Sequence, residues 1–102
     1  MATEITVNNN EEFEELIQNR DFKIADALVS TILKNLKGKK RHIHALSVVV
    51  KDDQSIYDIT IDRNDFISTL TLQLPTFEVE EEYERCGDIR DALIFLNKKT
   101  NE

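Results

Sequence analysis

The 102-residue sequence contains only two glycines, one proline and one cysteine. So few residues that favour irregular backbone predict long regular elements joined by tight connections, and they exclude a glycine-rich phosphate-binding loop. The lone cysteine, Cys86, excludes an internal disulfide bond. No apolar run approaches the ~20 residues of a membrane-spanning helix, and the first residues lack the basic start and apolar stretch of a secretory signal. We therefore expect a cytoplasmic protein that does not enter a membrane.

Length and composition are those of one small folded domain. A chain of 102 residues can bury one core, and 40% hydrophobic residues beside 32% charged residues is an ordinary balance for a folded protein. The formal charge of −7 repels a nucleic-acid backbone at long range, and a local cationic patch acts only within a Debye length of about 8–10 Å. We therefore do not expect general affinity for nucleic acid.

The first half of the chain predicts an arm and two helices. Residues 1–10 carry little apolar surface and are expected to form a flexible arm before a single α+β domain over residues 11–102. Apolar residues on one helical face predict a short helix over about 11–18. A second helix is expected over about 22–37, ended by Gly38. Its apolar residues recur at three and four positions: Ala25, Leu28, Val29, Ile32, Leu33 and Leu36.

After this helix the apolar period changes to two, which is typical of β-strands. The alternation predicts a strand over about 42–51, a polar turn over residues 51–54, and a second strand from Tyr57 to Asp62 that pairs back to complete a β-hairpin over residues 42–62. One face of this hairpin is expected to pack against the helix over 22–37. The residues expected to be buried there are Leu46, Val48, Tyr57, Ile59 and Ile61.

The stretch from Asn64 to Phe77 fits two interpretations. Alternating apolar residues favour a third strand at 66–74, whereas the three-four-three spacing of Ile67, Leu70, Leu74 and Phe77 favours a helix. We favour the helix, which Pro75 would kink or end. The same spacing in Cys86, Ile89, Leu93 and Leu96 predicts a last helix over about 82–97. The predicted fold is α+β in the order ααββαα, with a carboxy-terminal helical hairpin.

The segment Tyr83-Glu84-Arg85-Cys86-Gly87-Asp88-Ile89-Arg90-Asp91 resembles the second half of the UVR motif, a helical hairpin of excision-repair subunits and some Clp-protease adaptors. That motif reads aromatic, Glu, any residue, two small residues, acidic, aliphatic, Arg, Asp. The sequence departs from the family at Gly87, where alanine is usual, and at Pro75 in the first arm. Over residues 64–97 the resemblance implies association with a protein partner or a second copy, as a homodimer, and no catalysis.

One seam between two such helices cannot cover all of their apolar residues. The remaining side chains are expected to form a surface for a partner or for self-association, namely Phe66, Tyr83, Arg90, Asp91, Ile94 and Phe95. The predicted function is a small non-enzymatic interaction or regulatory module of a bacterium or its virus, acting through its carboxy-terminal helices.

A basic cluster follows the second helix, and comprises Lys37, Lys39, Lys40, Arg41 and His42. Cations after a helix are expected from the helix dipole alone, and the functional alternative is contact with phosphate or an acidic partner. Because no aromatic residues are interleaved, nucleic acid would be held only weakly and through its backbone. The acidic runs over 11–15 and 78–84 could instead mimic nucleic-acid phosphates, although a solvated helix face has the same pattern.

No motif for catalysis, a cofactor or a metal is evident. His42 and His44 share one strand face, as paired metal ligands would, but no spacing indicates a third ligand. Cys86 occupies a seam position, so we expect a buried thiol rather than a nucleophile. No nucleophile, base and oxyanion donor can be placed together, and we therefore expect a protein that is not an enzyme.

Overall fold

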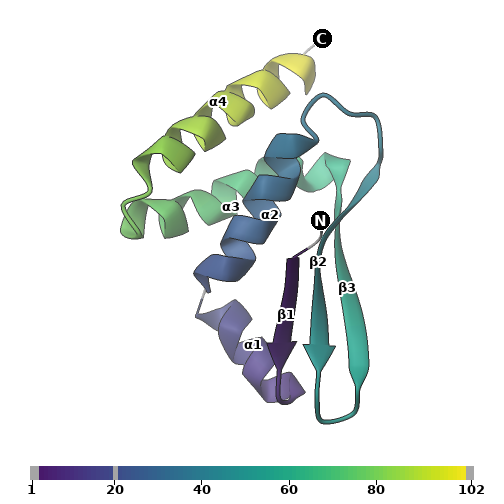
Figure 1. The fold of residues 1–102 in the computed structure, drawn as a ribbon. Helices are drawn as coiled ribbons and strands as arrows, with labels where there is room; N and C mark the ends of the chain where they lie inside the picture. Colours follow the sequence, from purple (N-terminus) through teal and green to yellow (C-terminus); the bar gives the residue numbers. More distant parts are fainter. Residues whose placement is uncertain (1–2, 20, 101–102) are drawn as a thin grey trace.

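The computed structural model describes residues 3–19 and 21–100. The chain forms an α+β fold in which the helices lie on one side of a three-stranded sheet (Figure 1). The elements are β1 (Thr3–Val7), α1 (Asn10–Gln18), α2 (Phe22–Lys34), β2 (His42–Val50), β3 (Ser55–Asp62), the 3-10 turn η1 (Arg63–Asp65), α3 (Phe66–Val79) and α4 (Tyr83–Thr100). The predicted fold class and the helix over 66–74 are confirmed, and helix α2 ends three residues earlier than expected.

The first strand corrects the prediction of a flexible arm over residues 1–10. β1 pairs in parallel with β2, from Thr3 opposite Leu46 to Val7 opposite Val50. Val7 is buried, with 1% of its surface exposed. This strand has two apolar residues, Ile5 and Val7, which is too short an alternation to predict a strand by itself. Its order comes from hydrogen bonding to β2, a partner that is distant in sequence. Residues 1 and 2 lie outside the described part of the chain.

The predicted β-hairpin is confirmed as the antiparallel pair β2 and β3. The register shifts between His44 and Leu46, so Ala45 forms a bulge and is buried together with Leu46. A bulge of this kind lets two consecutive residues face the core. The other face of the sheet carries His44, Asp58 and further polar side chains, and no helix covers it.

The predicted burial of the hairpin face is confirmed for three residues, is partial for Ile59 and is wrong for Tyr57. Leu46, Val48 and Ile61 are buried, while Ile59 is half-buried and Tyr57 is 45% exposed. The helices pack mainly on the other two strands, since α1 contacts β1 and α2 contacts β2. Tyr57 faces the same side as the core but lies on the edge strand, beyond the cover of the helices.

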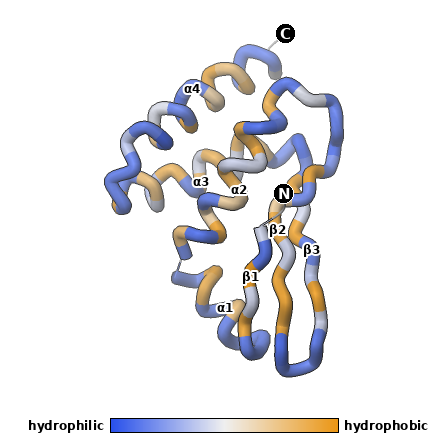
Figure 2. The backbone as a smooth tube through the Cα atoms, in the orientation of Figure 1, coloured by the Kyte–Doolittle hydropathy of each residue, from blue (hydrophilic) through white to orange (hydrophobic). Residues whose placement is uncertain are grey.

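Helix α2 lies between the sheet and the carboxy-terminal helices, and it contacts β2, α3 and α4. Its buried residues Ala25, Ala27, Val29 and Ile32 belong to the one hydrophobic core. Figure 2 shows hydrophobic stretches in α2, α3 and the strands. The helix begins where Asp21 accepts a hydrogen bond from the backbone N–H of Lys23 at 2.9 Å, a common N-cap arrangement.

The helical hairpin is formed by α3 and α4, which run side by side (Figure 1). Leu70 and Phe77 of α3 and Cys86 and Ile89 of α4 are fully buried in the seam, and the expected burial of Cys86 is thus confirmed. Pro75 lies inside α3 without ending it. The turn between the helices holds Glu81 at a φ of 57°.

Arg85 ties the hairpin to α2. Its guanidinium forms an ion pair with Asp26 at 2.7 Å, donates to the Ser30 hydroxyl at 2.9 Å, and lies 5.2 Å from the centre of the Phe77 ring. Because it contacts α2 and α3 together, Arg85 fixes how α4 sits on both helices.

Among residues 3–19 and 21–100, no helix combines the length and the apolar character that a membrane span requires.

Gly87 provides a test of the α4 packing. A Cβ atom added at Gly87 would meet no atom within 4 Å, so Gly87→Ala should gain helix propensity without a clash and raise the free energy of unfolding by about 1 kcal/mol. The contrasting variant is Gly38→Ala, which lies outside the helices and whose Cβ would lie 3.2 Å from Nη2 of Arg63, so it should bring no gain. Urea unfolding measures both; a destabilised Gly87→Ala variant would contradict this packing.

Candidate interaction surfaces

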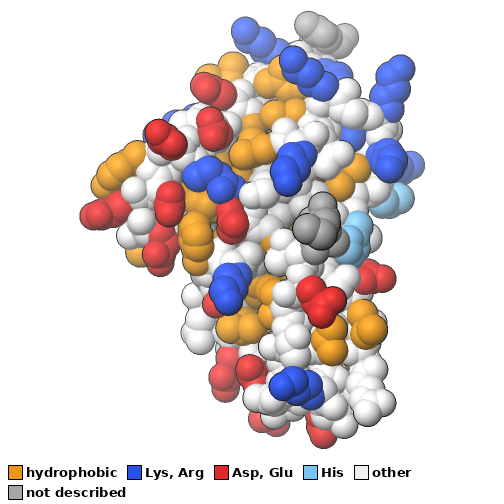
Figure 3. Space-filling view, viewed as in Figure 1, with side chains coloured by type: hydrophobic (Ala, Val, Ile, Leu, Met, Phe, Trp, Pro, Cys, Tyr) orange, Lys and Arg blue, Asp and Glu red, His pale blue; other side chains and the backbone are white. Residues whose placement is uncertain are grey.

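A groove between α2 and α4 is lined by residues of both predicted sites, Asp91 and Phe95 of the interaction surface and Lys37 of the basic cluster. It has a volume of about 350 Å³, and its lining residues are Leu33, Leu36, Lys37, Asp88, Asp91, Ala92 and Phe95. Figure 3 shows hydrophobic side chains between α2 and α4, with acidic and basic side chains around them. The groove therefore has an apolar floor, two carboxylates on the α4 side and an ammonium group beyond the end of α2.

The outer face of α4 carries most of the predicted interaction surface. Tyr83 is 70% exposed and Ile94 is 56% exposed, and Arg90 lies between them on the same helical stripe. Asp91 and Phe95 directly follow Arg90 and Ile94 in the sequence, so they lie on the adjacent side of the helix, where they line the groove. Five of the six predicted residues are thus brought to one side of α4. An apolar groove rimmed by charged residues is typical of an interaction site.

Phe66, the sixth predicted residue, does not belong to this surface. It is completely buried at the start of α3, and the guanidinium carbon of Arg63 lies 4.9 Å from the centre of its ring. The prediction assumed one seam between α3 and α4, which left Phe66 without cover. In the structure Phe66 lies where β3 turns into α3, and the core extends to that junction.

The basic cluster occupies the connection between α2 and β2 and the first residue of β2, His42, and all five predicted residues are exposed. Arg63 holds this connection in place, because its Nε donates to the carbonyl of Lys40 at 2.7 Å and its Nη1 donates to the carbonyl of Asn35 at 2.8 Å. In the described chain, Lys37, Lys39 and Lys40 form no ion pair. The cluster therefore presents unpaired ammonium groups on a connection anchored at both ends.

Asp62 neutralises the strand end of the basic cluster. Its carboxylate lies 3.6 Å from Arg41 and 3.6 Å from His42, and it accepts a hydrogen bond from the backbone N–H of Asn64 at 2.8 Å. The Asn64 N–H, followed by the charges of Arg41 and His42, lowers the pKa of Asp62 below its ordinary value of 3.8, against the opposing effect of partial burial. The ionised carboxylate is thus favoured in the folded state.

A cluster of His44, Ser47 and Asp58 on the open sheet face was not predicted from the sequence. Ser47 donates to Asp58 at 2.8 Å, and Nε2 of His44 lies 3.1 Å from the Ser47 hydroxyl and 3.4 Å from Asp58. Both contacts use the same ring nitrogen, so the histidine is not placed to take a proton from serine while aspartate holds its other nitrogen. The three residues form a surface hydrogen-bond network.

Metal-ligating side chains do not gather into a site in the part of the chain that the structure describes. No group of three His, Cys, Asp or Glu side chains has the proximity to hold an ion there.

No protein-family model matches the chain, and no curated protein or solved structure is significantly similar to it. The candidate surfaces therefore depend on the residues of this chain alone, and the resemblance of residues 64–97 to the UVR motif stays a prediction.

The lowered pKa of Asp62 predicts a pH-dependent contribution to stability. A carboxylate with a depressed folded-state pKa stabilises the fold above its unfolded pKa of 3.8, and this contribution is lost as pH falls through the folded pKa. Asp62→Asn should therefore be less stable than the wild type at neutral pH, and the difference should shrink in acid. Urea unfolding across this pH range measures the difference; a constant difference at every pH would contradict the assignment.

Proposed function

We propose that the protein is a small non-enzymatic interaction module that binds a protein partner through α4 and the groove between α2 and α4. The observation that carries this proposal is the exposed Ile94 beside a groove with an apolar floor and walls of opposite charge. The UVR-like residues from Tyr83 to Asp91 support an accessory or regulatory role in the cytoplasm of a bacterium, for a bacterial or a phage protein.

The chemistry of the groove favours an amphipathic helix as the bound element of the partner. Apolar side chains on one helical face would enter between Leu36 and Phe95, which are both half-buried, as in other complexes where a helix lies in a groove. A cation of the partner would meet Asp88 and Asp91, and an anion would meet Lys37. These charges fix the direction in which the helix lies and favour one partner over another.

Substitution at Ile94 tests the proposed surface. Ile94→Asp should leave the fold intact, because the side chain is 56% exposed, and it should weaken partner binding by about tenfold or more, since a charge at an apolar contact must be desolvated. The matched control is Ile17→Asp on α1, where the side chain is 52% exposed and the charge change is identical. Phe95 is a poorer position for this test, because it is half-buried.

The partner is first isolated by photo-crosslinking from position 94 in native cells, and its affinity for each purified variant is then measured by calorimetry. Loss of binding in Ile94→Asp with retention in Ile17→Asp supports the proposal. Equal affinity in both variants, or capture from position 17 and not from position 94, contradicts it.

The basic cluster supports a second candidate, weak binding of an anionic chain such as a nucleic-acid backbone. The supporting observation is that Lys37, Lys39 and Lys40 are exposed on a connection held by Arg63. Lys99 lines the same depression as Arg63 and adds a further cation. Backbone contacts of this kind weaken steeply as salt rises, because bound cations are released from the nucleic acid.

A charge reversal with a matched control tests this second candidate. The double variant Lys39→Glu with Lys40→Glu should abolish retention on single-stranded and duplex nucleic acid at low salt, because the local positive field is reversed. The control, Lys23→Glu with Lys51→Glu, makes the same change in net charge at exposed positions on other elements. Equal retention of the two double variants, or no retention of the wild type at low salt, would exclude this candidate.

A further inference from the structure

The edge strand β3 is left open to another strand. It pairs with β2 on one side, and no further strand of the described residues lies on the other. Natural edge strands are commonly protected by charged side chains (above all lysine), proline, bulges or short length. The sequence of β3, SIYDITID over Ser55–Asp62, has two aspartates but no lysine or proline, it is eight residues long, and the register shift lies in β2. Eight consecutive residues therefore present a regular backbone edge.

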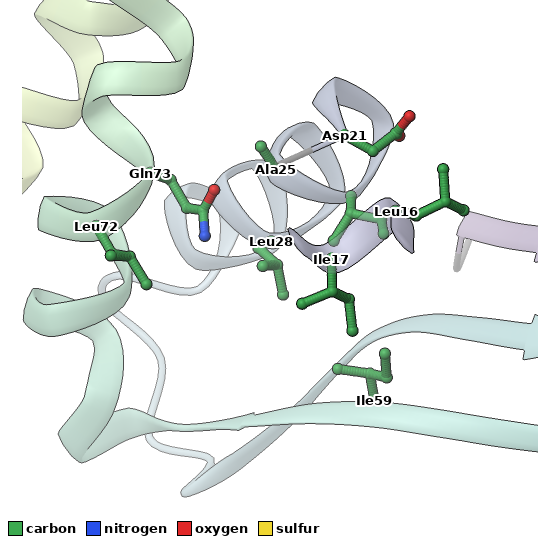
Figure 4. Close-up of a pocket in the computed structure, with 9 residues that line it drawn as sticks. Leu16, Ile17, Asp21, Ala25, Leu28, Ile59, Leu72 and Gln73 are labelled. Atoms are coloured by element: carbon green, nitrogen blue, oxygen red, sulfur yellow. The ribbon is translucent and has the colours of Figure 1, made fainter. Parts of the chain in front are cut away.

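An apolar groove lies beside this edge. Leu16 and Ile17 of α1, Leu28 of α2, Ile59 of β3 and Leu72 of α3 surround a space of about 270 Å³ (Figure 4). Two of these side chains are more than half exposed, Ile17 at 52% and Leu72 at 59%. Four different elements thus contribute apolar surface next to an unpaired strand.

Tyr57 faces the core side of the sheet, but no helix covers its side chain. It is opposite the buried Val48 and faces the same side of the sheet, yet it is 45% exposed. A side chain on the core face of an edge strand becomes buried when a further strand extends the sheet. The exposure of Tyr57 is therefore explained if β3 acquires a neighbour.

We propose that this neighbour is β3 of a second copy, paired antiparallel about a two-fold axis so that two three-stranded sheets become continuous. The self-complementarity of the strand supports a second copy. Side chains that are directly opposite each other share a face of the sheet. The two-fold axis must therefore lie between two copies of the same residue, which are opposite each other. With Ile59 on the axis, Ile59 meets Ile59 of the second copy, Asp58 meets Thr60, and Ile56 meets Asp62.

The other registers are less favourable. Centring on Asp58 places the two Asp58 carboxylates opposite each other, and centring on Thr60 places Asp58 opposite Asp62, and like charges in opposite positions are destabilising. Centring on Tyr57 places residues 60–62 opposite the hairpin turn of the second copy, where no strand is present. The register centred on Ile59 avoids both problems and sets Tyr57 beside Ile61 of the second copy on the core side.

The net charge sets the salt dependence of this pairing. Each copy carries a formal charge of −7, so the two copies repel each other at long range and added salt screens the repulsion. Dimerisation should therefore strengthen as salt rises, which is opposite to the salt dependence expected for nucleic-acid binding by the basic cluster.

Charge substitution at Ile56 tests the strand and the register together. Ile56 is 67% exposed on the open face of the sheet, so a polar residue there should leave the monomer folded. Ile56→Asp places a carboxylate opposite Asp62 on both sides of the axis and should raise the dimer dissociation constant about tenfold. Ile56→Lys places an opposite charge at the same position and should bind at least as tightly as the wild type. The control Thr6→Asp adds the same charge at an exposed position of β1 and should leave the dimer dissociation constant unchanged.

Sedimentation equilibrium of the wild type, these three variants and Ile94→Asp at low and high salt gives the dissociation constants, and circular dichroism verifies the fold. A tighter wild-type dimer at high salt, weakened by Asp and retained by Lys at position 56, supports the pairing. The proposal is overturned if the wild type stays monomeric at every concentration, or if the Asp and Lys variants weaken the dimer equally. It is also overturned if Ile94→Asp, rather than Ile56→Asp, dissociates the dimer.

Discussion

Helix α2 is the element on which the rest of the structure depends, because it contacts β2 on one side and both α3 and α4 on others. A small sheet or a helical hairpin has little core of its own and is marginal in water. Each becomes stable here by burying its apolar face against α2. The small buried residues Ala25 and Ala27 let the neighbouring elements approach closely, and Arg85 adds a directional contact by pairing with Asp26 while lying over Phe77.

The sequence predicted those elements whose apolar residues repeat over several turns or strand positions. Helices α2 and α4 and the β2–β3 hairpin have such repeats, and they form where expected. The strand β1 has two apolar residues and depends on pairing with β2, a distant contact that no local pattern contains. The predicted burial of Tyr57 and the predicted exposure of Phe66 were wrong for a related reason. Periodicity predicts which way a side chain faces, but whether another element covers that side is decided by the tertiary fold.

The candidate surface divides in the same way. The helical period of α4 places Tyr83, Arg90 and Ile94 on one exposed stripe, and this could be predicted from spacing alone. The groove could not be predicted, because Leu33 and Leu36 continue the apolar pattern of the predicted second helix. That they are only half-buried and line a groove with residues of α4 is a result of the tertiary packing. The anchoring of the basic cluster by Arg63 is also a tertiary feature, since it uses backbone carbonyls at Asn35 and Lys40 that no sequence pattern identifies.

The proposed surfaces are contributed by different elements, and this determines which of them compete. Lys37 belongs both to the groove and to the basic cluster, so an acidic partner in the groove and an anionic chain on the cluster would exclude each other. The β3 edge shares no residue with either. A dimer paired through β3 would therefore keep both grooves free and present two of them in a fixed two-fold arrangement. Such an arrangement binds a partner with two helices, or a dimeric partner, more tightly than one groove does, because the second contact forms within one complex.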